Sequence, residues 1–394
     1  MLNFPTKALA LSLDIFLKNV RQSPGQALKI PIQLRWGGCL GGEVQSIQVV
    51  ATWARLEGSG RIIRIPSNFF SQEKTRVRFA STLHGMAALY FAEQIDCGGE
   101  PYNRYSALRE VKPRIDAMQS GKFNDTLRGQ AAALCCFIGA KNEFLRTLYS
   151  KAVPGAVREN TDFQILLQRI LKDLSVRDDA LTDGQLDYLS GLIYQLFLNS
   201  DEHGSFDESG ERFTTGMRGL VVRVATFANL KSLIDYAGDD TALKTYLLKL
   251  PFQDTKKNLI TKNDGKLSLG SIRLLELSVF DTGPGMGLRW LSEKEGHRSY
   301  AEISHEEELA AVHTCFEKHA TTKANLLKGQ GLHQALIALS RLKAFMTLRT
   351  GRLSLYQDFS RSDTTDFKPK DRFSKLKRMP EIVGTSYSIC FRLK

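Results

Sequence analysis

Residues 272–290 read I-R-L-L-E-L-S-V-F-D-T-G-P-G-M-G-L-R-W. The apolar residues over 272–280, partly alternating and partly consecutive, predict a buried β-strand, which leads directly into Asp281. A buried carboxylate is costly unless hydrogen-bond donors meet it, and Gly283 and Gly285 let a ligand approach the backbone closely. An adenine amino group would suit Asp281, and a phosphate would suit the exposed backbone N–H groups. The alternative is a tight turn at the end of a strand, capped by Asp281.

Two further stretches place polar groups on helices. Residues 192–204 predict a helix with an apolar face. Its polar residues Gln195, Asn199, Glu202 and His203 fall on one side. Downstream, K-G-Q-G-L over 328–332 puts a glycine pair at the start of a second helix, whose free N–H groups and positive dipole end attract anions. Near the end of the chain, G-T over 384–385 begins a final strand.

In this order, the Asn-bearing helix, the strand ending in D-x-G-x-G, the helix opened by G-x-G-L and the Gly-Thr strand resemble the GHKL superfamily, also called the Bergerat fold. That family includes DNA gyrase, the heat-shock chaperone ATPases, histidine kinases and MutL. The resemblance covers roughly residues 160–394, about three fifths of the chain. It implies an α/β (α+β) fold, a two-layer sandwich of a mixed, mostly antiparallel sheet with helices on one face.

The resemblance implies that the chain binds ATP and Mg²⁺. Asn199 would hold the Mg²⁺ ion, which takes few protein ligands besides phosphates and water. Asp281 would accept a hydrogen bond from the adenine amino group, with Thr385 beside it. The other implied contacts are Gly283 and Gly285 at the base and sugar, Met286 next to them, and Lys328, Gly329, Gly331 and Leu332 at the phosphates. Lys323 and Lys328 could reach the same anion, although solvated lysines explain them equally well.

One position departs from the family pattern. In the hydrolytic branches, the residue one helical turn before the metal-binding Asn is a Glu that acts as general base, whereas this chain has Gln195. An amide cannot take a proton from water, and general-base catalysis typically contributes about 10²–10⁴-fold. We therefore expect hydrolysis to be slow or to use another group. The sequence does not select among the candidates, which are Glu202, His203, Glu306 and Glu307.

The composition predicts a cytoplasmic protein without a membrane partner. Hydrophobic residues make up 42% and charged residues 24%, as in ordinary globular domains. No window approaches the ~20 consecutive apolar residues that a bilayer span needs, and the N-terminus has no clear signal peptide. The six cysteines lack C-x-x-C spacing, which favours buried free thiols in a reducing compartment.

The basic charge of the chain, +12, makes an acidic partner plausible. Residues 361–378 contain seven basic and three acidic residues, with Phe367 and Phe373 interleaved. Such a run could bind nucleic acid, and a solvated charged loop explains it as well.

The chain length allows two domains at about 150 residues each. We expect an N-terminal α/β regulatory or adaptor domain over 1–104, a helical connector over 105–157 and the ATP-binding domain over 158–394. Within the first domain, strands are predicted over 27–36, 46–53 and 61–65, and helices over 10–20 and 81–95. Helices are also predicted over 105–118, 126–148 and 162–174, an inserted helical segment over 229–250, and a lid-like segment over 291–328.

These observations favour an intracellular, nucleotide-gated signalling switch, in which Mg-ATP orders the lid and changes how the protein meets a protein partner. One alternative is a kinase resembling the anti-sigma serine kinases. A second is a MutL-like clamp on nucleic acid that forms a homodimer with ATP, and a third is a scaffold without turnover. A histidine kinase of the usual sort is disfavoured, because no histidine lies between His84 and His203. Whether the protein is an ATPase or a phosphotransferase stays open.

Overall fold

The computed structural model belongs to the α/β class and contains two main sheets. It describes the chain apart from residues 35–39, 57–59, 67–68, 70–71, 99–101, 141–142, 251–259, 262–266, 269–271, 297, 319–330, 362–364 and 374–377, and apart from the side chains of 260–261 and 267–268. A two-residue hairpin, β8 (Ile260–Thr261) and β9 (Leu267–Ser268), stands apart from both sheets.

The smaller sheet is formed by the N-terminal part of the chain. Its strands are β1 (Leu2–Asn3), β2 (Leu28–Lys29), β3 (Ile62–Arg64), β4 (Gln94–Asp96) and β5 (Tyr102–Asn103), in that spatial order. The first four strands are parallel and β5 is antiparallel. The helices between them are α1 (Ala10–Gln22), α2 (Gly42–Arg55), α3 (Glu73–Ala80) and α4 (Leu83–Phe91).

The larger sheet has seven antiparallel strands in the order β13-β12-β11-β14-β10-β7-β6. Its strands are β6 (Ala131–Phe137), β7 (Met217–Phe227), β10 (Ile272–Asp281), β11 (Phe345–Gly351), β12 (Leu353–Asp358), β13 (Lys370–Asp371) and β14 (Ile382–Arg392). The predicted strand over 272–280 is β10, which lies between β7 and β14 and is buried on both faces. Asp281 therefore lies at the end of a central strand of the sheet.

Helices from the rest of the chain surround this sheet. They are α5 (Arg104–Ser120), α6 (Asn160–Asp173), α7 (Asp183–Gly204), α8 (Leu230–Ala237), α9 (Thr241–Lys249), α10 (Met286–Glu295), α11 (His305–Cys315) and α12 (Gly331–Arg341), with short 3-10 turns at Phe123–Asp125 and Asp178–Ala180. The helices predicted over 162–174 and 192–204 are thus present as α6 and α7. The capping box of α7, in which Thr182 and Gln185 exchange hydrogen bonds, explains why that helix begins where it does.

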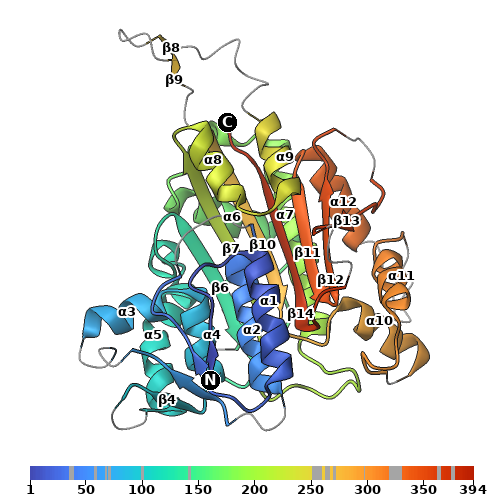
Figure 1. Cartoon of the computed structure of the whole chain (residues 1–394). Helices are drawn as coiled ribbons and strands as arrows, with labels where there is room; N and C mark the ends of the chain where they lie inside the picture. Colours follow the sequence, from blue (N-terminus) through green and yellow to red (C-terminus); the bar gives the residue numbers. More distant parts are fainter. Residues whose placement is uncertain are drawn as a thin grey trace.

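Helices cover both faces of the larger sheet, which differs from the expectation of helices on one face. The end of α7 packs on Asp281, whereas Arg223, on the opposite face by strand alternation, pairs with Glu43 of α2. Helices α8 and α9 share an apolar cluster with that second face. In Figure 1, α1, α2, α8 and α9 lie in front of the sheet and α6 and α7 behind it.

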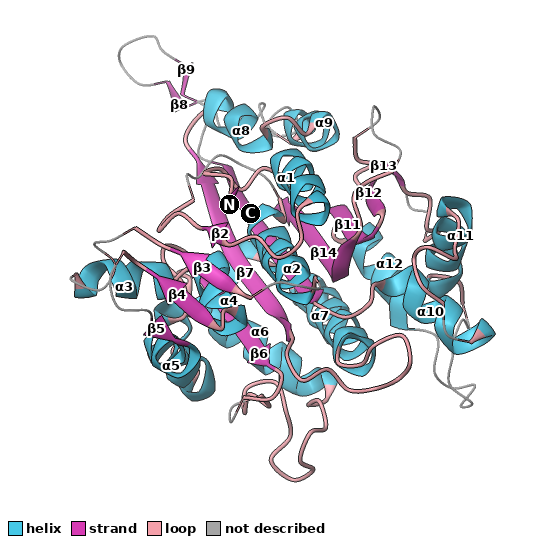
Figure 2. Ribbon diagram, turned by 60° about the horizontal axis from the view of Figure 1, so that its bottom comes forward, coloured by secondary structure: helices cyan, strands magenta, loops and turns pink. Residues whose placement is uncertain are grey.

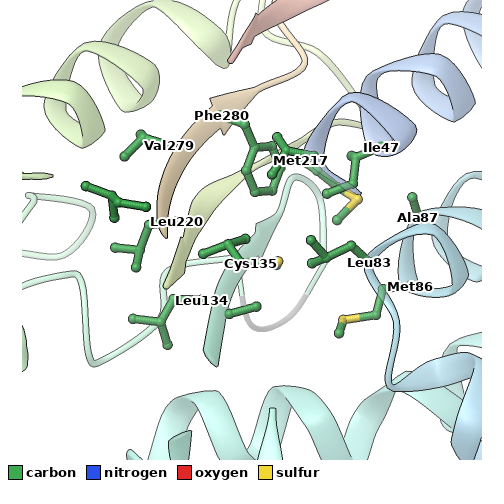
Figure 3. Close-up of a cluster of buried hydrophobic side chains, with 14 of the residues drawn as sticks. Ile47, Leu83, Met86, Ala87, Leu134, Cys135, Met217, Leu220, Val279 and Phe280 are labelled. Carbon is green, nitrogen blue, oxygen red and sulfur yellow. The ribbon is translucent and has the colours of Figure 1, made fainter. Parts of the chain in front are cut away.

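The two sheets share one hydrophobic core, which runs from Leu2 to Leu393. Figure 3 shows Ile47 of α2 and Met86 of α4 on the same side of strands β6, β7 and β10 as Met217 and Phe280. The expected boundaries near 104 and 157 therefore do not coincide with a break in this core.

Two predicted elements are wrong. Residues 46–53, expected as a strand, lie within α2, where every residue from Val44 to Ala54 is buried. Polar residues of α2 such as Gln48 and Thr52 are buried together with its apolar ones, so no exposed polar face marks the helical period. Residues 126–148, expected as a helix, contain β6, whose seven residues are all buried. A fully buried strand of alanine, leucine, cysteine and phenylalanine cannot be distinguished from a helix by periodicity.

Of the expected strand over 27–36, residues Leu28–Lys29 are present as β2, and residues 35–36 lie outside the described residues. The predicted segment over 229–250 is confirmed as helical, and it forms α8 and α9. In the part of the chain that the structure describes, no helix has both the length and the apolar run needed to cross a bilayer.

Candidate functional site

Asp281 is the last residue of β10, and only 6% of it is exposed. Its Oδ1 atom accepts hydrogen bonds from the backbone N–H groups of Gly283, at 2.9 Å, and Thr385, at 3.2 Å. Both donors belong to the backbone, so the turn after β10 and the start of β14 together fix the carboxylate. Among the described residues, Oδ2 has no donor, which leaves it available to an external hydrogen-bond donor.

Three glycines allow the backbone to close around Asp281. A Cβ atom on Gly204, the last residue of α7, would lie 2.3 Å from Cβ of Asp281. A Cβ on Gly283 would lie 2.8 Å from Cα of Gly204, and one on Gly384 would lie 2.0 Å from the carbonyl oxygen of Asp281. These distances are too short for any side chain, so the contact between α7, β10 and β14 depends on glycine.

Burial raises the pKa of Asp281 to about 6, because desolvation disfavours the charged carboxylate. The hydrogen bonds from Gly283 and Thr385 and the electrostatic influence of His203 and Arg55 act in the opposite direction. The carboxylate is therefore ionised at neutral pH and becomes protonated in mildly acidic solution.

The turn after β10 is tied to the β11–β14 side of the sheet. The hydroxyl of Thr350 accepts a hydrogen bond from the backbone N–H of Met286 at 2.8 Å and lies 3.1 Å from the hydroxyl of Thr385. Gly285 adopts φ = 97°, and a Cβ there would lie 2.5 Å from the hydroxyl of Tyr300. Gly285 is thus required by the fold of the turn itself, which adds a structural role to the predicted contact with base and sugar.

The predicted phosphate end lies where α7 meets the start of α12. A Cβ on Gly331 would lie 2.4 Å from Oε1 of Gln195 and 3.9 Å from Nδ2 of Asn199. The Nδ2 group of Asn199 donates to the carbonyl of Gln195 at 3.1 Å, so Oδ1 is the side-chain atom suited to a cation. Leu332 is 8% exposed and packs in the core rather than facing a ligand.

Of the other predicted site residues, Glu202 and His203 are described by the structure, and Lys323, Lys328 and Gly329 are not. Glu202 is half-buried on α7. His203 is also half-buried, and its Nδ1 atom lies 3.7 Å from Oε1 of Glu293 in α10, beyond hydrogen-bond distance. Lys323, Lys328 and Gly329 lie outside the described residues. Among the described residues, no group of three or more His, Cys, Asp and Glu side chains is arranged to hold a metal ion.

The predicted lid begins with helices that are anchored. Helices α10 and α11 enclose a small apolar core of their own, formed by Leu288, Leu291, Ile303 and Ala311. In Figure 2 these two helices lie side by side, next to α12. The fully buried Glu308 of α11 accepts hydrogen bonds from the backbone and guanidinium of Arg352. The described part of the segment is therefore held on the β11–β12 turn, and residues 319–328 lie outside the described residues.

The other residues proposed to activate water lie on α11. Glu306 is exposed, and Glu307 closes the capping box with Ser304. Neither side chain is brought to α7 by a contact in the described part of the chain.

The basic run over 361–378 is only partly a surface feature. Phe367 stacks on Phe316 with ring centroids 3.8 Å apart. Arg372 is 5% exposed and pairs with the buried Asp240. Two of the groups on which a nucleic-acid interface would depend are thus engaged within the protein, which favours the alternative of a charged loop.

Sequence reasoning missed Arg55, at the C-terminus of α2. Its guanidinium donates to the carbonyl oxygens of Thr282 and Thr215 and lies 3.8 Å from the ring centroid of Phe213. Arg55 and Thr282 are 227 positions apart, and no local spacing signals such a contact.

No model of a known protein family matches this chain, and neither a curated protein nor a solved structure matches it. The residues described above are therefore the basis on which a function is proposed.

Proposed function

We propose that the protein binds Mg-ATP in the manner of the GHKL superfamily and acts as a nucleotide-gated switch toward a protein partner. The adenine would meet Asp281, and the phosphates and Mg²⁺ would lie between Asn199 and the start of α12. The larger sheet with α6, α7 and α12 would form the Bergerat-type layer, and α1, α2, α8 and α9 would be additions on its second face.

The observation that carries this proposal is the geometry of the Asp281 carboxylate. A buried charge at a strand end is costly, and here two backbone donors hold one oxygen while the other has no donor among the described residues. A carboxylate that served only as a turn cap would be satisfied by those two donors, whereas a second oxygen without a donor suits an exocyclic amino group.

The α7–α12 contact supports the other end of the nucleotide. Gln195 and Asn199 lie one helical turn apart and face Gly331, the first residue of α12. A helix N-terminus offers N–H groups and a favourable dipole to phosphate. Asn199 would supply a single oxygen to Mg²⁺, whose remaining ligands would be phosphates and water.

Hydrolysis should be slow, because Gln195 occupies the position at which a general base is expected. The half-buried Glu202 and His203 lie on the same helix and could take over this role in a conditional manner. A switch that holds ATP for long periods needs no fast turnover, so the amide is compatible with the proposal.

Isothermal titration calorimetry with ATP and Mg²⁺ tests the proposal. We expect the wild-type protein to bind ATP and Asp281→Asn to bind at least about 10-fold more weakly, since the amide presents a donor to a donor. Asp116→Asn is the matched control, because Asp116 is 53% exposed on α5 in a pair with Lys112. Absence of heat with every purine triphosphate, or equal affinity of Asp281→Asn and wild type, would contradict the proposal.

A further inference from the structure

Helix α2 carries three polar residues that all reach the backbone around the Asp281 carboxylate. Gln48, Thr52 and Arg55 are spaced at i, i+4 and i+7, which places them on one side of the helix. We call these three residues the polar stripe. They lie in the N-terminal part of the chain, which the resemblance to the GHKL superfamily does not cover.

The first two members hold the start of β14. Gln48 donates to the carbonyl of Val383 at 3.1 Å and accepts from the hydroxyl of Ser386 at 2.9 Å. Thr52 accepts from the backbone N–H of Val383 at 3.1 Å. These contacts bracket Thr385, whose N–H group is one of the two donors to Asp281.

The third member holds the other side of the carboxylate. Arg55 donates to the carbonyl of Thr282, the residue directly after Asp281. Its second nitrogen donates to the carbonyl of Thr215 at 3.2 Å. Burial lowers the pKa of Arg55 to about 10, and attraction to Asp281 opposes this shift, so the guanidinium remains charged at neutral pH.

We propose that α2 is a built-in part of the nucleotide site, with the polar stripe positioning Asp281 and Thr385 and with Arg55 as its charged positioning residue. This inference rests on the proposed function. The N-terminal part of the chain would then contribute to ATP affinity from the sheet face opposite to α7, without touching the nucleotide.

The physical reason lies in the cost of the arrangement. Burying a guanidinium and a carboxylate near each other requires hydrogen bonds and favourable charge to offset the lost hydration. Apolar packing between α2 and the sheet would not need either group. A polar stripe at this place instead keeps the carboxylate ionised and holds both of its backbone donors at a fixed distance.

Calorimetric titration with Mg-ATP between pH 5 and 8 tests this inference in wild type, Arg55→Gln and Arg55→Lys. We expect Arg55→Gln to lose about 10- to 100-fold in affinity, as for hydrogen bonds made by a charged group. Arg55→Lys keeps the charge and should recover part of that loss. Arg64→Gln is the control, because Arg64 in β3 is 51% exposed in a pair with Asp96.

The pH profile separates positioning from general damage. The groups that act on Asp281 are Arg55 of α2, His203 of α7, Tyr387 of β14 and the N–H groups of Gly283 and Thr385. Without the charge of Arg55, the pKa of Asp281 should rise. The fall of ATP affinity in acid, which we call the acid limb, should therefore begin at a higher pH in Arg55→Gln than in wild type. In Arg55→Lys, which keeps the charge, this shift should be smaller.

The outcomes are distinguishable. A wild-type protein that binds no purine nucleotide would end the proposed function itself. A wild type that binds ATP, with Arg55→Gln equal to it in affinity and acid limb, would overturn only the role of α2. Weak binding of Arg55→Gln with an unmoved acid limb and no recovery by lysine would also overturn it. If circular dichroism shows that Arg55→Gln does not fold, Thr52→Val takes its place. This variant removes the acceptor for the Val383 N–H group and should weaken ATP binding several-fold. Unchanged binding by Thr52→Val would contradict the inference.

Discussion

The proposed ATP binding should depend on pH through Asp281. Its pKa of about 6 in the folded protein lies above the usual value for aspartate, chiefly because of burial. The two backbone donors occupy Oδ1, so a proton taken up in acid would sit on Oδ2 and repel an amino group. We therefore expect affinity to be constant above about pH 7 and to fall as the pH decreases through about 6.

Calorimetry of Mg-ATP binding from pH 5 to 8 measures this effect. Asp281→Asn gives the baseline, since it keeps His203, Arg55 and every titrating group of the nucleotide. The difference between the two profiles belongs to the carboxylate. Parallel profiles for wild type and Asp281→Asn would show that this carboxylate does not meet the ligand.

The sequence predicted that Asp281 follows a core strand, that Asn199 lies on a helix and that Gly331 begins one, because each sits in a short local pattern. The contacts that hold them were not predictable. Arg55 at the end of α2 donates to the carbonyl of Thr282, 227 positions later in the chain, and Thr350 of β11 accepts from the N–H group of Met286, 64 positions earlier. Such contacts depend on how the helices and strands pack in three dimensions, which cannot be inferred from the local spacing of residues.

At the scale of elements, the contact between α7 and β10 depends on Gly204. Replacing helical glycine by alanine usually stabilises a protein by about 0.5–1 kcal/mol. In Gly204→Ala, however, the new Cβ would lie 2.3 Å from Cβ of Asp281, and neither backbone can retreat easily. We expect a loss of about 1–3 kcal/mol, as for an overpacked core, together with weaker ATP binding.

Urea unfolding followed by circular dichroism checks this expectation against a control in the same helix. In Gly191→Ala, the closest neighbour of the new Cβ is Oδ1 of Asn160 at 4.0 Å, so this variant should gain stability. If both variants gain alike, the close approach of α7 to β10 is not a constraint on the fold.

The elements that were predicted best from the sequence are those with one solvent-exposed face. Helices α6 and α7 show the 3.6-residue period because each buries one stripe and exposes another. Helix α2 was predicted as a strand and strand β6 as part of a helix, because nearly every residue of both elements is buried, and in α2 the polar residues Gln48 and Thr52 are buried together with the apolar ones. Burial on all sides removes the contrast between an exposed polar face and a buried apolar face, from which a helix or a strand is inferred.

At the scale of the whole molecule, the first hundred residues are not an appendage. Helix α2 donates to and accepts from β14, and Tyr90 of α4 bonds to the backbone of Ile138 and Gly216 beside the larger sheet. A regulatory signal received by this part of the chain would therefore reach the Asp281 carboxylate through hydrogen bonds rather than through a flexible linker.

Asp14 and Arg349 form a buried pair that joins α1 to β11. The guanidinium nitrogens lie 2.8 and 3.0 Å from Oδ1 of Asp14, and the two side chains are 2% and 4% exposed. Removing one partner of a buried pair leaves the other charge uncompensated and typically costs about 3–5 kcal/mol. We expect Asp14→Ala to fall near the lower end, because Arg349 keeps its bonds to the carbonyls of Gly351 and Pro380.

The control is Asp116→Ala, which breaks an exposed pair in α5 and should cost under about 1 kcal/mol. Free energies of unfolding from urea titration compare the two variants directly. The cooperativity of unfolding gives a second measure. If α1 is joined to the larger sheet, Asp14→Ala should still unfold in a single transition, with its midpoint at a lower urea concentration than in wild type. A separate early transition in which the N-terminal helices unfold alone, with the larger sheet unchanged in stability, would mean that the two parts of the chain fold independently and that α2 cannot position Asp281.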